Sequence, residues 1–335
     1  MFNSRVIVTA YGGPEVLTLV QEPLRMPDRD EVRVKVQSSG VALADIMRRE
    51  GKFPNPPMPP FTPGYDAVGV IDELGEDVKQ FRKGDKVAVF YNGTGGYAAY
   101  VYAKSDELVA VPPQMDSSLA VAAVLNYVTA YQMLHRIAKV SEGESILIHG
   151  ASGGTGTALL ELGRLAKLKM YGTASLAKHH IVSGYGAIPI DYRNEDFVDV
   201  LRLHAPEGIN AVFDPIGGEN YERSLRTLSR NGRFISYGYT SVLQERDSGN
   251  WEKEWSRLAK AQTTEQGHPM HLYSITLLKK EQPDWFREDA SAVLSLLEDG
   301  LIHPLVSHRI PLQEAAKAQE LLERSLAVGK VVLVN

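Results

Sequence analysis

The chain has 335 residues, and its 36 lysines and arginines against 41 aspartates and glutamates give a formal net charge of −5. This length suggests about two domains, and 44% hydrophobic with 23% charged residues is typical of a globular protein, not a disordered or fibrous one. The mildly acidic balance gives no electrostatic reason to bind nucleic acid or an anionic membrane. The absence of cysteine excludes disulfide scaffolds, thiolate zinc sites, iron–sulfur clusters and cysteine nucleophiles.

The start of the chain carries no targeting signal. Residues 1–9 lack the basic start and apolar core of a signal peptide, and no window approaches the roughly 20 apolar residues of a membrane span. We therefore expect a cytoplasmic protein without integral membrane association.

The first third of the chain reads as short strands separated by proline and glycine. Residues 31–37 alternate valine with charged or polar residues, which predicts a half-buried strand. Residues 53–64 contain six prolines and therefore form an irregular loop. Further strands are predicted at 68–74, 84–90 and 96–101. Together they indicate a compact, antiparallel, barrel-like domain.

From residue 117 onward the pattern changes to alternating strands and helices. Residues 117–125 and 127–139 are predicted helical, and a short apolar strand follows at 145–149. Helices are then predicted at 158–168, near 176, at 195–204, 221–228 and 290–298, and strands at 169–173, 187–190, 211–214, 232–237 and 330–334. This alternation predicts a doubly wound parallel sheet, so the fold class is α/β. The charged stretch around Trp251 and Trp255 fits a surface helix within the less readable segment 241–285.

A glycine-rich turn connects the first strand of this series to its first helix. Gly150, Gly153 and Gly156 lie three residues apart in the run 146–158. Phosphates bind at such turns because the first amides of the helix are unpaired and glycine lets the backbone approach closely. A tight turn without a ligand is the alternative, but the position within a βαβ series favours dinucleotide binding.

The end of the second strand favours NADPH over NADH. NAD sites usually place an acidic residue there, whereas this strand ends at Ser175 with Lys178 three residues later. A hydroxyl and an ammonium suit a 2′-phosphate. Taken alone, Lys178 favours an ordinary solvated lysine on a helix face, and only the missing acid and Ser175 beside it favour the phosphate. Tyr192 and Arg193 are further candidate neighbours of the phosphate.

These motifs together resemble a known family. The segments that carry the resemblance are 62–69, 84–87, 95–98, 125–131, 150–156, 172–179, 190–192 and 214–218. In this order they are similar to the zinc-independent medium-chain dehydrogenases/reductases of the quinone oxidoreductase (zeta-crystallin) type, and most similar to the branch of the synaptic vesicle amine transport protein. The resemblance implies a homodimeric, NADPH-binding protein with its active site between two domains.

The resemblance also implies domain limits and cofactor contacts. It implies a GroES-like β-barrel catalytic domain at 1–124, a Rossmann domain at 125–265 and a C-terminal segment, 266–335, that returns to the catalytic domain. Ser152, Gly153, Gly154 and Thr155 would lie at the pyrophosphate, and Thr173, Ser175, Lys178 and Tyr192 around the adenosine ribose phosphate. Tyr127, Thr129, Tyr237, Gly238 and Tyr239 would lie near the nicotinamide and its ribose.

The chain departs from the zinc-dependent relatives at the metal sites. It has no cysteine, and Tyr65 stands in place of the histidine of the Gly-His-Glu signature. His268 and His271 have a ligand-like spacing but no acidic or cysteine companion, so surface positions are expected for both. Ala42 and Met47 replace an asparagine and a tyrosine that are common in quinone reductases, which predicts a more apolar pocket.

Hydride chemistry without a metal favours a conjugated acceptor. A quinone or an α,β-unsaturated carbonyl accepts hydride at carbon and spreads the charge to oxygen, where hydrogen bonds suffice to stabilise it. We therefore predict an NADPH:quinone or enone reductase with a small-molecule substrate and no nucleic-acid partner. The catalytic candidates are Tyr65, Tyr127, Asp45 and Arg49; a helix-capping role for Asp45, and its pairing with Arg49, are the structural alternatives. The alternative function is an NADPH-binding scaffold or lipid-handling protein with little turnover.

Overall fold

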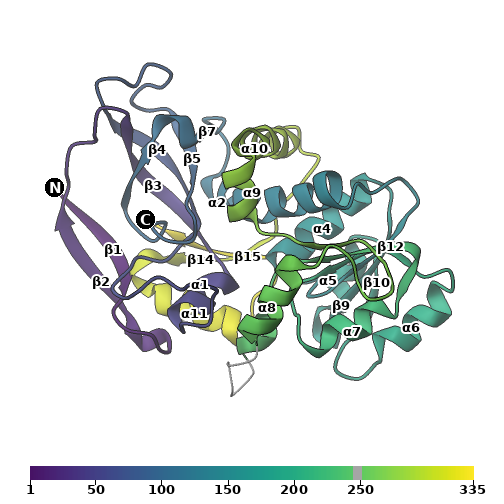
Figure 1. The fold of residues 1–335 in the computed structure, drawn as a ribbon. Helices are drawn as coiled ribbons and strands as arrows, with labels where there is room; N and C mark the ends of the chain where they lie inside the picture. The colour runs from purple at the N-terminus through teal and green to yellow at the C-terminus, as the bar shows by residue number, and fades with distance from the viewer. Residues whose placement is uncertain (244–250) are drawn as a thin grey trace. The chain divides into compact units, whose positions relative to one another are not determined.

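The computed structural model describes residues 1–243 and 251–335 and divides the chain into two compact units. Unit 1 contains Met1–Val128 and Arg287–Asn335, and unit 2 contains Thr129–Phe286 (Figure 1). The unit boundaries follow residues 128 and 286, whereas the sequence led us to expect domain boundaries after residues 124 and 265. The second lies later because β13 (Met270–Leu272) still pairs with β12 (Leu228–Ser236) in the sheet of unit 2.

Unit 1 is built on the strands β1 (Phe2–Val8), β2 (Leu17–Pro23), β3 (Glu31–Val41), β4 (Asp66–Leu74), β5 (Lys86–Phe90), β6 (Tyr100–Lys104), β7 (Leu108–Ala110), β14 (Val306–Pro311) and β15 (Lys330–Val334). The main sheet has the order β14-β15-β3-β4-β5-β7, with β6 paired to β3, and is antiparallel except between β14 and β15. Val32, Val34 and Val36 of β3 are buried together, as their alternation predicts. The β1-β2 hairpin was not anticipated.

Three α-helices lie entirely within unit 1. They are α1 (Leu43–Arg49), α2 (Ser117–Ala122) and α11 (Ala315–Glu323), while α3 (Val128–Tyr131) and α10 (Pro283–Glu298) span the two boundaries. Asp116 caps α2, because its carboxylate accepts hydrogen bonds from the amides of Ser118 and Leu119 at 2.8 and 2.9 Å. The chain continues through two π-helical segments, Ala123–Tyr127 and Gln132–Ile137, which confirms the helical character predicted there.

Unit 2 contains a six-stranded parallel sheet in the order β10-β9-β8-β11-β12-β13, with β8 at Ser145–Ile148, β9 at Lys169–Ala174, β10 at Ile188–Asp191 and β11 at Ile209–Asp214. Every adjacent pair is parallel, so the predicted doubly wound α/β sheet is confirmed. The direction of strand succession reverses between β8 and β11. Ligands of such sheets bind at the carboxyl ends of the strands at this reversal.

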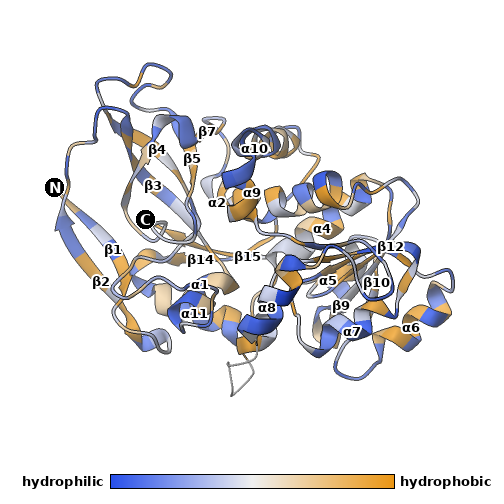
Figure 2. Ribbon diagram, viewed as in Figure 1, coloured by the Kyte–Doolittle hydropathy of each residue, from blue (hydrophilic) through white to orange (hydrophobic). Residues whose placement is uncertain are grey.

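The helices of unit 2 are α4 (Gly154–Leu165), α5 (His179–Gly184), α6 (Phe197–His204), α7 (Glu219–Leu225), α8 (Trp251–Lys260) and α9 (Ile275–Glu281). Helix α8 is mostly hydrophilic (Figure 2), which confirms the surface helix predicted around the tryptophans, although Leu258 on it is buried. Strand β13 and helix α9 were not predicted, and residues 244–250 of the same segment lie outside the described residues.

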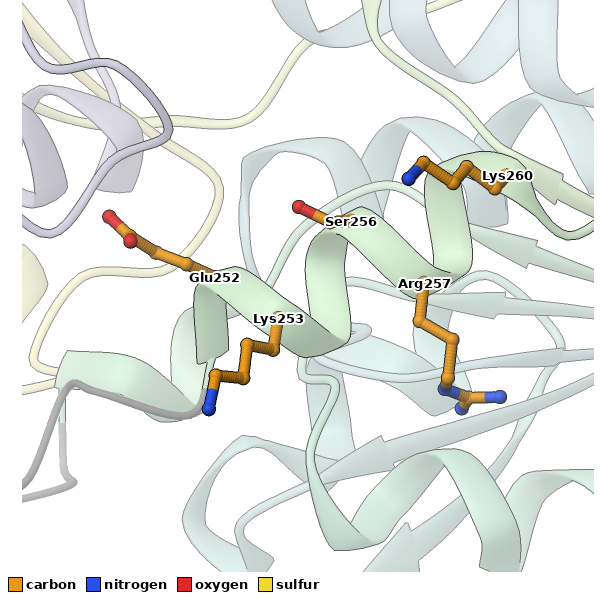
Figure 3. A pocket seen from close by; sticks show the side chains of 5 residues that line it. All are labelled: Glu252, Lys253, Ser256, Arg257 and Lys260. Carbon is orange, nitrogen blue, oxygen red and sulfur yellow. The ribbon is translucent and has the colours of Figure 1, made fainter.

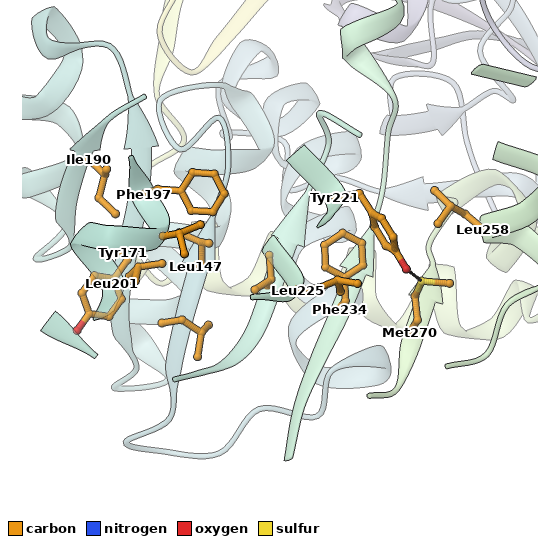
Figure 4. Packing of buried hydrophobic residues seen from close by; sticks show 13 residues of the cluster. Leu147, Tyr171, Ile190, Phe197, Leu201, Tyr221, Leu225, Phe234, Leu258 and Met270 are labelled. Atoms are coloured by element: carbon orange, nitrogen blue, oxygen red, sulfur yellow. Dashed lines mark hydrogen bonds between the residues drawn. The ribbon is translucent and has the colours of Figure 1, made fainter. Parts of the chain in front are cut away.

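A buried cluster joins the sheet of unit 2 to α6, α7 and α8 (Figure 4). Tyr221 and Phe234 meet edge to face with ring centroids 5.1 Å apart, and the Tyr221 hydroxyl donates to the sulfur of Met270 at 3.3 Å. Leu147 of β8 and Phe197 of α6 belong to the same cluster. This packing fixes the strand from which the glycine-rich turn departs.

Candidate active site

The glycine-rich turn at the end of β8 forms a backbone cradle. A Cβ on Gly156 would lie 2.3 Å from the carbonyl oxygen of Gly150, so only glycine fits this crossing of strand and helix. The N-cap of α4 is Gly153, which offers no side chain to the first amides of the helix. These amides point toward the space where a phosphate is bound in dinucleotide sites, and the helix dipole favours an anion there.

A buried neutral histidine holds the turn in place. His149 is 2% exposed; its Nδ1 lies 3.1 Å from the Thr173 hydroxyl and its Nε2 lies 3.0 Å from the Ser224 hydroxyl. Burial, and secondarily the charge of Arg223, lower the pKa of His149 to about 3. The Thr173 hydroxyl also accepts the Gly150 amide hydrogen at 3.2 Å. Thr173, predicted near the ribose phosphate, therefore has its hydroxyl engaged in the turn.

Two cationic side chains lie at the ends of the neighbouring strands β9 and β10. Asp191 of β10 is in register with Ala174 of β9, so Ser175 and Lys178 come close to Tyr192 and Arg193. Lys178 is half-buried, and its pKa is lowered by burial and by the positive charge of Arg193. The sequence predicts a grouping of Ser175, Lys178, Tyr192 and Arg193, and the register of β9 and β10 brings these residues together.

Asp191, the acidic residue at the end of β10, is bound to its own loop. The Asp191 carboxylate accepts hydrogen bonds from the Asn194 side-chain amide at 2.6 Å and from the Arg193 backbone amide at 3.2 Å. The Asn194 hydrogen bond is the main cause of its lowered pKa. This carboxylate follows the third strand of the series, whereas the end of β9, where an NAD site usually carries its acid, has none.

The carboxyl ends of β11 and β12 carry a second set of polar groups. Asp214 is fully buried, and its carboxylate accepts from the Ile216 amide at 2.7 Å and from the Asn220 side chain at 3.1 Å. Burial raises its pKa to about 6 despite these hydrogen bonds. Tyr237 follows β12, and its amide donates to the Asp214 carbonyl at 3.0 Å. The loop of Tyr237, Gly238 and Tyr239 is thus fixed at the end of the sheet.

Two predicted nicotinamide neighbours lie on the helical segment near the unit boundary. Tyr127 ends the first π-helical segment of unit 1 and is 2% exposed, and Thr129 on α3 of unit 2 is 6% exposed. Tyr239 is also buried, and a Cβ on Gly217 would lie 2.5 Å from its ring. The contact of these residues with a cofactor remains a prediction.

The acidic candidate of unit 1, Asp45, is a buried helix-terminal residue. It occupies the third position of α1, and its Oδ2 accepts from the Ala42 amide at 2.9 Å and from the Tyr97 hydroxyl at 3.0 Å. Burial raises its pKa to about 6, and the Ala42 hydrogen bond and the charge of Arg48 oppose this shift. Asp45 therefore stabilises the start of α1, in line with the helix-capping alternative. The N-cap residue itself is Ala42, and Asp45 acts from the third position of the helix.

Arg49 does not pair with Asp45, and that predicted pairing is wrong. Its guanidinium is fully buried, donates to the Gly12 carbonyl at 2.9 Å and to the Gln319 side chain at 2.7 Å, and forms ion pairs with Glu50 and Glu323. These partners tie α1 to α11 and to the loop after β1. The sequence could not indicate them because Gln319 and Glu323 lie far along the chain.

The neighbouring Arg48 was not selected from the sequence, yet it contacts the candidate Tyr65. Its Nη1 donates to the Tyr65 hydroxyl at 2.5 Å, and its guanidinium carbon lies 3.6 Å from the Phe53 ring centroid. Arg48 and Tyr65 are 5% and 6% exposed. A pair of adjacent arginines on one short helix was the available signal, since the two must face different directions.

A separate hollow lies on the surface of unit 2. This shallow hollow is lined by Glu252, Lys253, Ser256, Arg257 and Lys260, all exposed on α8 (Figure 3), and it has no buried polar group aimed into it. Among residues 1–243 and 251–335, no three histidine, cysteine or acidic side chains gather as metal ligands. Within the same residues, no helix is long and apolar enough to cross a membrane.

Known proteins match this chain over almost its whole length. The model of the alcohol dehydrogenase GroES-like domain matches residues 28–113, and the model described as zinc-binding dehydrogenase matches residues 185–333. Quinone oxidoreductase of Lama guanicoe is 32% identical over 98% of this chain and 96% of its own length. The synaptic vesicle membrane protein VAT-1 homolog of Danio rerio is 31% identical over 98% of this chain and 69% of its own length.

The fold agrees with these matches. The crystal structure of Escherichia coli quinone oxidoreductase complexed with NADPH has a TM-score of 0.87 and 26% identity to this chain, covering 99% of this chain and 100% of that one. The GroES-like match falls within unit 1, and unit 2 has the Rossmann-like parallel sheet. The chain therefore belongs to the quinone oxidoreductase family of the medium-chain dehydrogenases/reductases and is an oxidoreductase.

Proposed function

We propose that this protein is an NADPH-dependent, zinc-independent reductase that transfers hydride to a quinone or an α,β-unsaturated carbonyl compound. The observation that carries the cofactor choice is the Lys178–Arg193 pair at the ends of β9 and β10. Burial and, secondarily, the positive charge of Arg193 lower the pKa of Lys178, and an anion bound between the two cations would oppose both effects. A 2′-phosphate supplies that anion, and NADH lacks it.

The residues present fit the rest of the dinucleotide. The cradle at Gly156, which a Cβ would fill, and the uncapped start of α4 suit the pyrophosphate. The proposed contacts are Ser152, Gly153, Gly154 and Thr155 at the pyrophosphate; Thr173, Ser175, Lys178 and Tyr192 at the adenosine ribose phosphate; and Tyr127, Thr129, Tyr237, Gly238 and Tyr239 at the nicotinamide ribose and ring. When bound, NADPH supplies a hydride from its nicotinamide ring.

The choice of a conjugated acceptor rests on the chemistry of the side chains. Reduction of a simple ketone needs an electrophile at the carbonyl oxygen, the role that zinc fills in other dehydrogenases. This chain has no cysteine to hold zinc, and Tyr65 occupies the position of a zinc-binding histidine. A conjugated acceptor needs only hydrogen bonds to its oxygen, which hydroxyl and guanidinium groups provide.

The cofactor proposal is tested by binding measurements. We expect Lys178→Ala to weaken NADPH binding by about tenfold to 100-fold, the loss of one charge-assisted hydrogen bond, and to change NADH binding little. Lys169→Ala, at the exposed opposite end of β9, is the matched control and should leave both affinities unchanged. Fluorescence titration gives both dissociation constants. Equal losses for NADPH and NADH in Lys178→Ala would contradict the assignment.

The acceptor is tested by following NADPH absorbance with a panel of small quinones and enones. Saturable oxidation by at least one member supports the reductase. Tight NADPH binding without turnover on any acceptor would instead favour the scaffold or lipid-handling function, which Ala42 and the buried, apolar Met47 also suit. A homodimer and a cytoplasmic location belong to the same proposal, and light scattering of the purified protein measures the first.

A further inference from the structure

Arg48 lies in an unusual environment inside unit 1. Its guanidinium carbon lies 3.6 Å from the centroid of the Phe53 ring and 4.6 Å from the centroid of the Tyr65 ring. It donates to the Tyr65 hydroxyl at 2.5 Å, to the Asn92 carbonyl at 3.3 Å and to the Ala44 carbonyl at 3.4 Å. Every hydrogen-bond partner is neutral, so the full positive charge is held in an aromatic and carbonyl shell.

No carboxylate balances this charge at close range. Among residues 1–243 and 251–335, the ion pairs include Arg49 but not Arg48. The charge of Arg48 acts on Asp45, yet the carboxylate of Asp45 hydrogen-bonds to Ala42 and Tyr97. A buried cation without a bound counter-ion costs stability, so such an arrangement favours a ligand that brings or develops negative charge.

The Tyr65 hydroxyl can donate a hydrogen bond to a bound molecule. Its oxygen accepts the Arg48 hydrogen bond, and within the described part of the chain no acceptor receives its own hydrogen. The side chain is 6% exposed, and its ring lies 6.0 Å from that of Phe90. A phenol that accepts a bond from a cation is a stronger donor, because the cation stabilises the negative oxygen that remains after proton loss.

The loop after β5 is shaped around the guanidinium. Gly93 has φ +95°, and a Cβ at this position would lie 2.4 Å from the guanidinium carbon of Arg48. The backbone conformation at position 93 favours glycine, and a Cβ there would displace the guanidinium. The guanidinium of Arg48 therefore contacts the backbone at Gly93 and two aromatic rings.

We propose that Tyr65, polarised by Arg48, is the proton donor to the oxygen of the acceptor. This rests on the proposed function. Hydride from the cofactor forms a new C–H bond at the β-carbon of an enone, or at the corresponding quinone position, and the π electrons move onto the oxygen. The Tyr65 O–H bond breaks and its proton goes to that oxygen, giving an enol and a phenolate. For a quinone, this enol becomes the hydroquinone when the carbon that received the hydride loses a proton to water and the second carbonyl oxygen gains one. Arg48 stabilises the phenolate until water reprotonates it.

The first test uses no cofactor. The probe is 4-nitrophenol, whose bound phenolate form mimics the oxyanion and is visible by its colour. We expect the wild-type protein to favour the phenolate form on binding, and both Tyr65→Phe and Arg48→Met to weaken its binding by about tenfold or more. Arg29→Met is the control, since its exposed guanidinium pairs only with surface acids. Unchanged binding in both site variants would overturn the proposal.

The second test is kinetic. Tyr65→Phe and Arg48→Met should each lower kcat/KM about 100-fold with the best acceptor of the panel, while NADPH affinity stays unchanged. Arg48→Lys keeps the charge and should recover part of the loss. Tyr65→Phe keeps the ring packing, so it remains informative if Arg48→Met does not fold. If the wild-type protein turned over no acceptor, this would contradict only the proposed function. The 4-nitrophenol test does not depend on turnover and would still test the role of Tyr65 and Arg48.

The pH profile separates proton donation from a packing role. The charged groups that act on Tyr65 are Arg48, Asp45 and Asp66; burial raises the pKa of Tyr65, Arg48 lowers it, and the two carboxylates raise it. Since the proton donor must be protonated, kcat/KM falls at high pH. In Arg48→Met the pKa of Tyr65 should rise, so the fall in kcat/KM at high pH should begin at a higher pH. A fall that begins at the same pH as in the wild-type protein would overturn the role of Arg48.

Discussion

The two units bury ionisable groups in different ways. In unit 2, His149 and Asp214 are buried but hydrogen-bonded to neighbouring hydroxyl and amide groups, and both support backbone turns at strand ends. In unit 1, Asp66 and Lys330 are 0% and 3% exposed, and within the described residues neither charged group has a side-chain hydrogen-bond partner, although the backbone of Gly40 and Leu125 acts on the Asp66 carboxylate. The buried polar groups of unit 2 thus shape the backbone at the strand ends, whereas unit 1 buries an acidic and a basic side chain near each other.

The largest expected effect comes from breaking the charge balance of unit 1. The Asp66 carboxylate and the Lys330 ammonium both lie within 3 Å of the position that a Cβ on Gly40 would occupy, and Lys330 lowers the raised pKa of Asp66. Lys330→Met leaves the carboxylate buried without its cation and should cost about 3–5 kcal/mol of unfolding free energy, measured in urea. Lys317→Met, an exposed lysine on α11, should cost less than about 0.5 kcal/mol. Equal effects would show that the buried charges are not coupled.

The cradle of unit 2 should respond to a single methyl group. Gly156→Ala places its Cβ against the Gly150 carbonyl and should cost about 1–3 kcal/mol of stability and at least about tenfold in NADPH affinity. Gly184→Ala is the control, because a Cβ there meets nothing within 4 Å. Isothermal titration measures the NADPH affinity. A loss of stability without a loss of NADPH affinity would show that this turn does not form the phosphate site.

The neutral state of His149 predicts an acid-sensitive unit 2. Its folded pKa of about 3 lies below the ordinary 6.5, so the unfolded chain binds the proton first and stability falls as pH drops from about 6.5 toward 3. Asp214 and Asp45, with pKa values raised to about 6, act in the opposite direction. His149→Gln should remove about one proton from the slope of unfolding free energy against pH. An unchanged slope would mean that His149 is charged in the fold.

The smallest effect concerns the two cations at the ends of β9 and β10. Arg193→Met removes the neighbouring charge, so the pKa of Lys178 should rise toward its ordinary value. NADPH affinity should then fall a few-fold at neutral pH, while its decline at high pH, where Lys178 loses its proton, moves to higher pH. Fluorescence titration across pH measures this, and NADH serves as the control without a 2′-phosphate. A decline that stays at the same pH would rule out Lys178 as its source.

The strand–helix alternation and the glycine-rich turn could be predicted because both depend on residues close together in sequence. Arg48 and Arg49 could not be distinguished in this way. Each is an arginine on the same turn of α1, but one faces Tyr65 and Asn92 and the other faces Gln319 on α11. The direction of each side chain depends on the position of α1 against distant segments. The β1-β2 hairpin and α9 were missed because the hydrophobic residues in these segments show no strong strand or helix periodicity.

The contact between Arg48 and Gly93 has an evolutionary consequence. No side chain at position 93 is compatible with the guanidinium where it lies, because even a methyl group would overlap its carbon. Substitution at one position should therefore be inherited only together with change at the other, and the two positions should covary among homologues. A family member with a residue other than glycine at 93 is expected to lack arginine at 48 and to protonate its acceptor by another group.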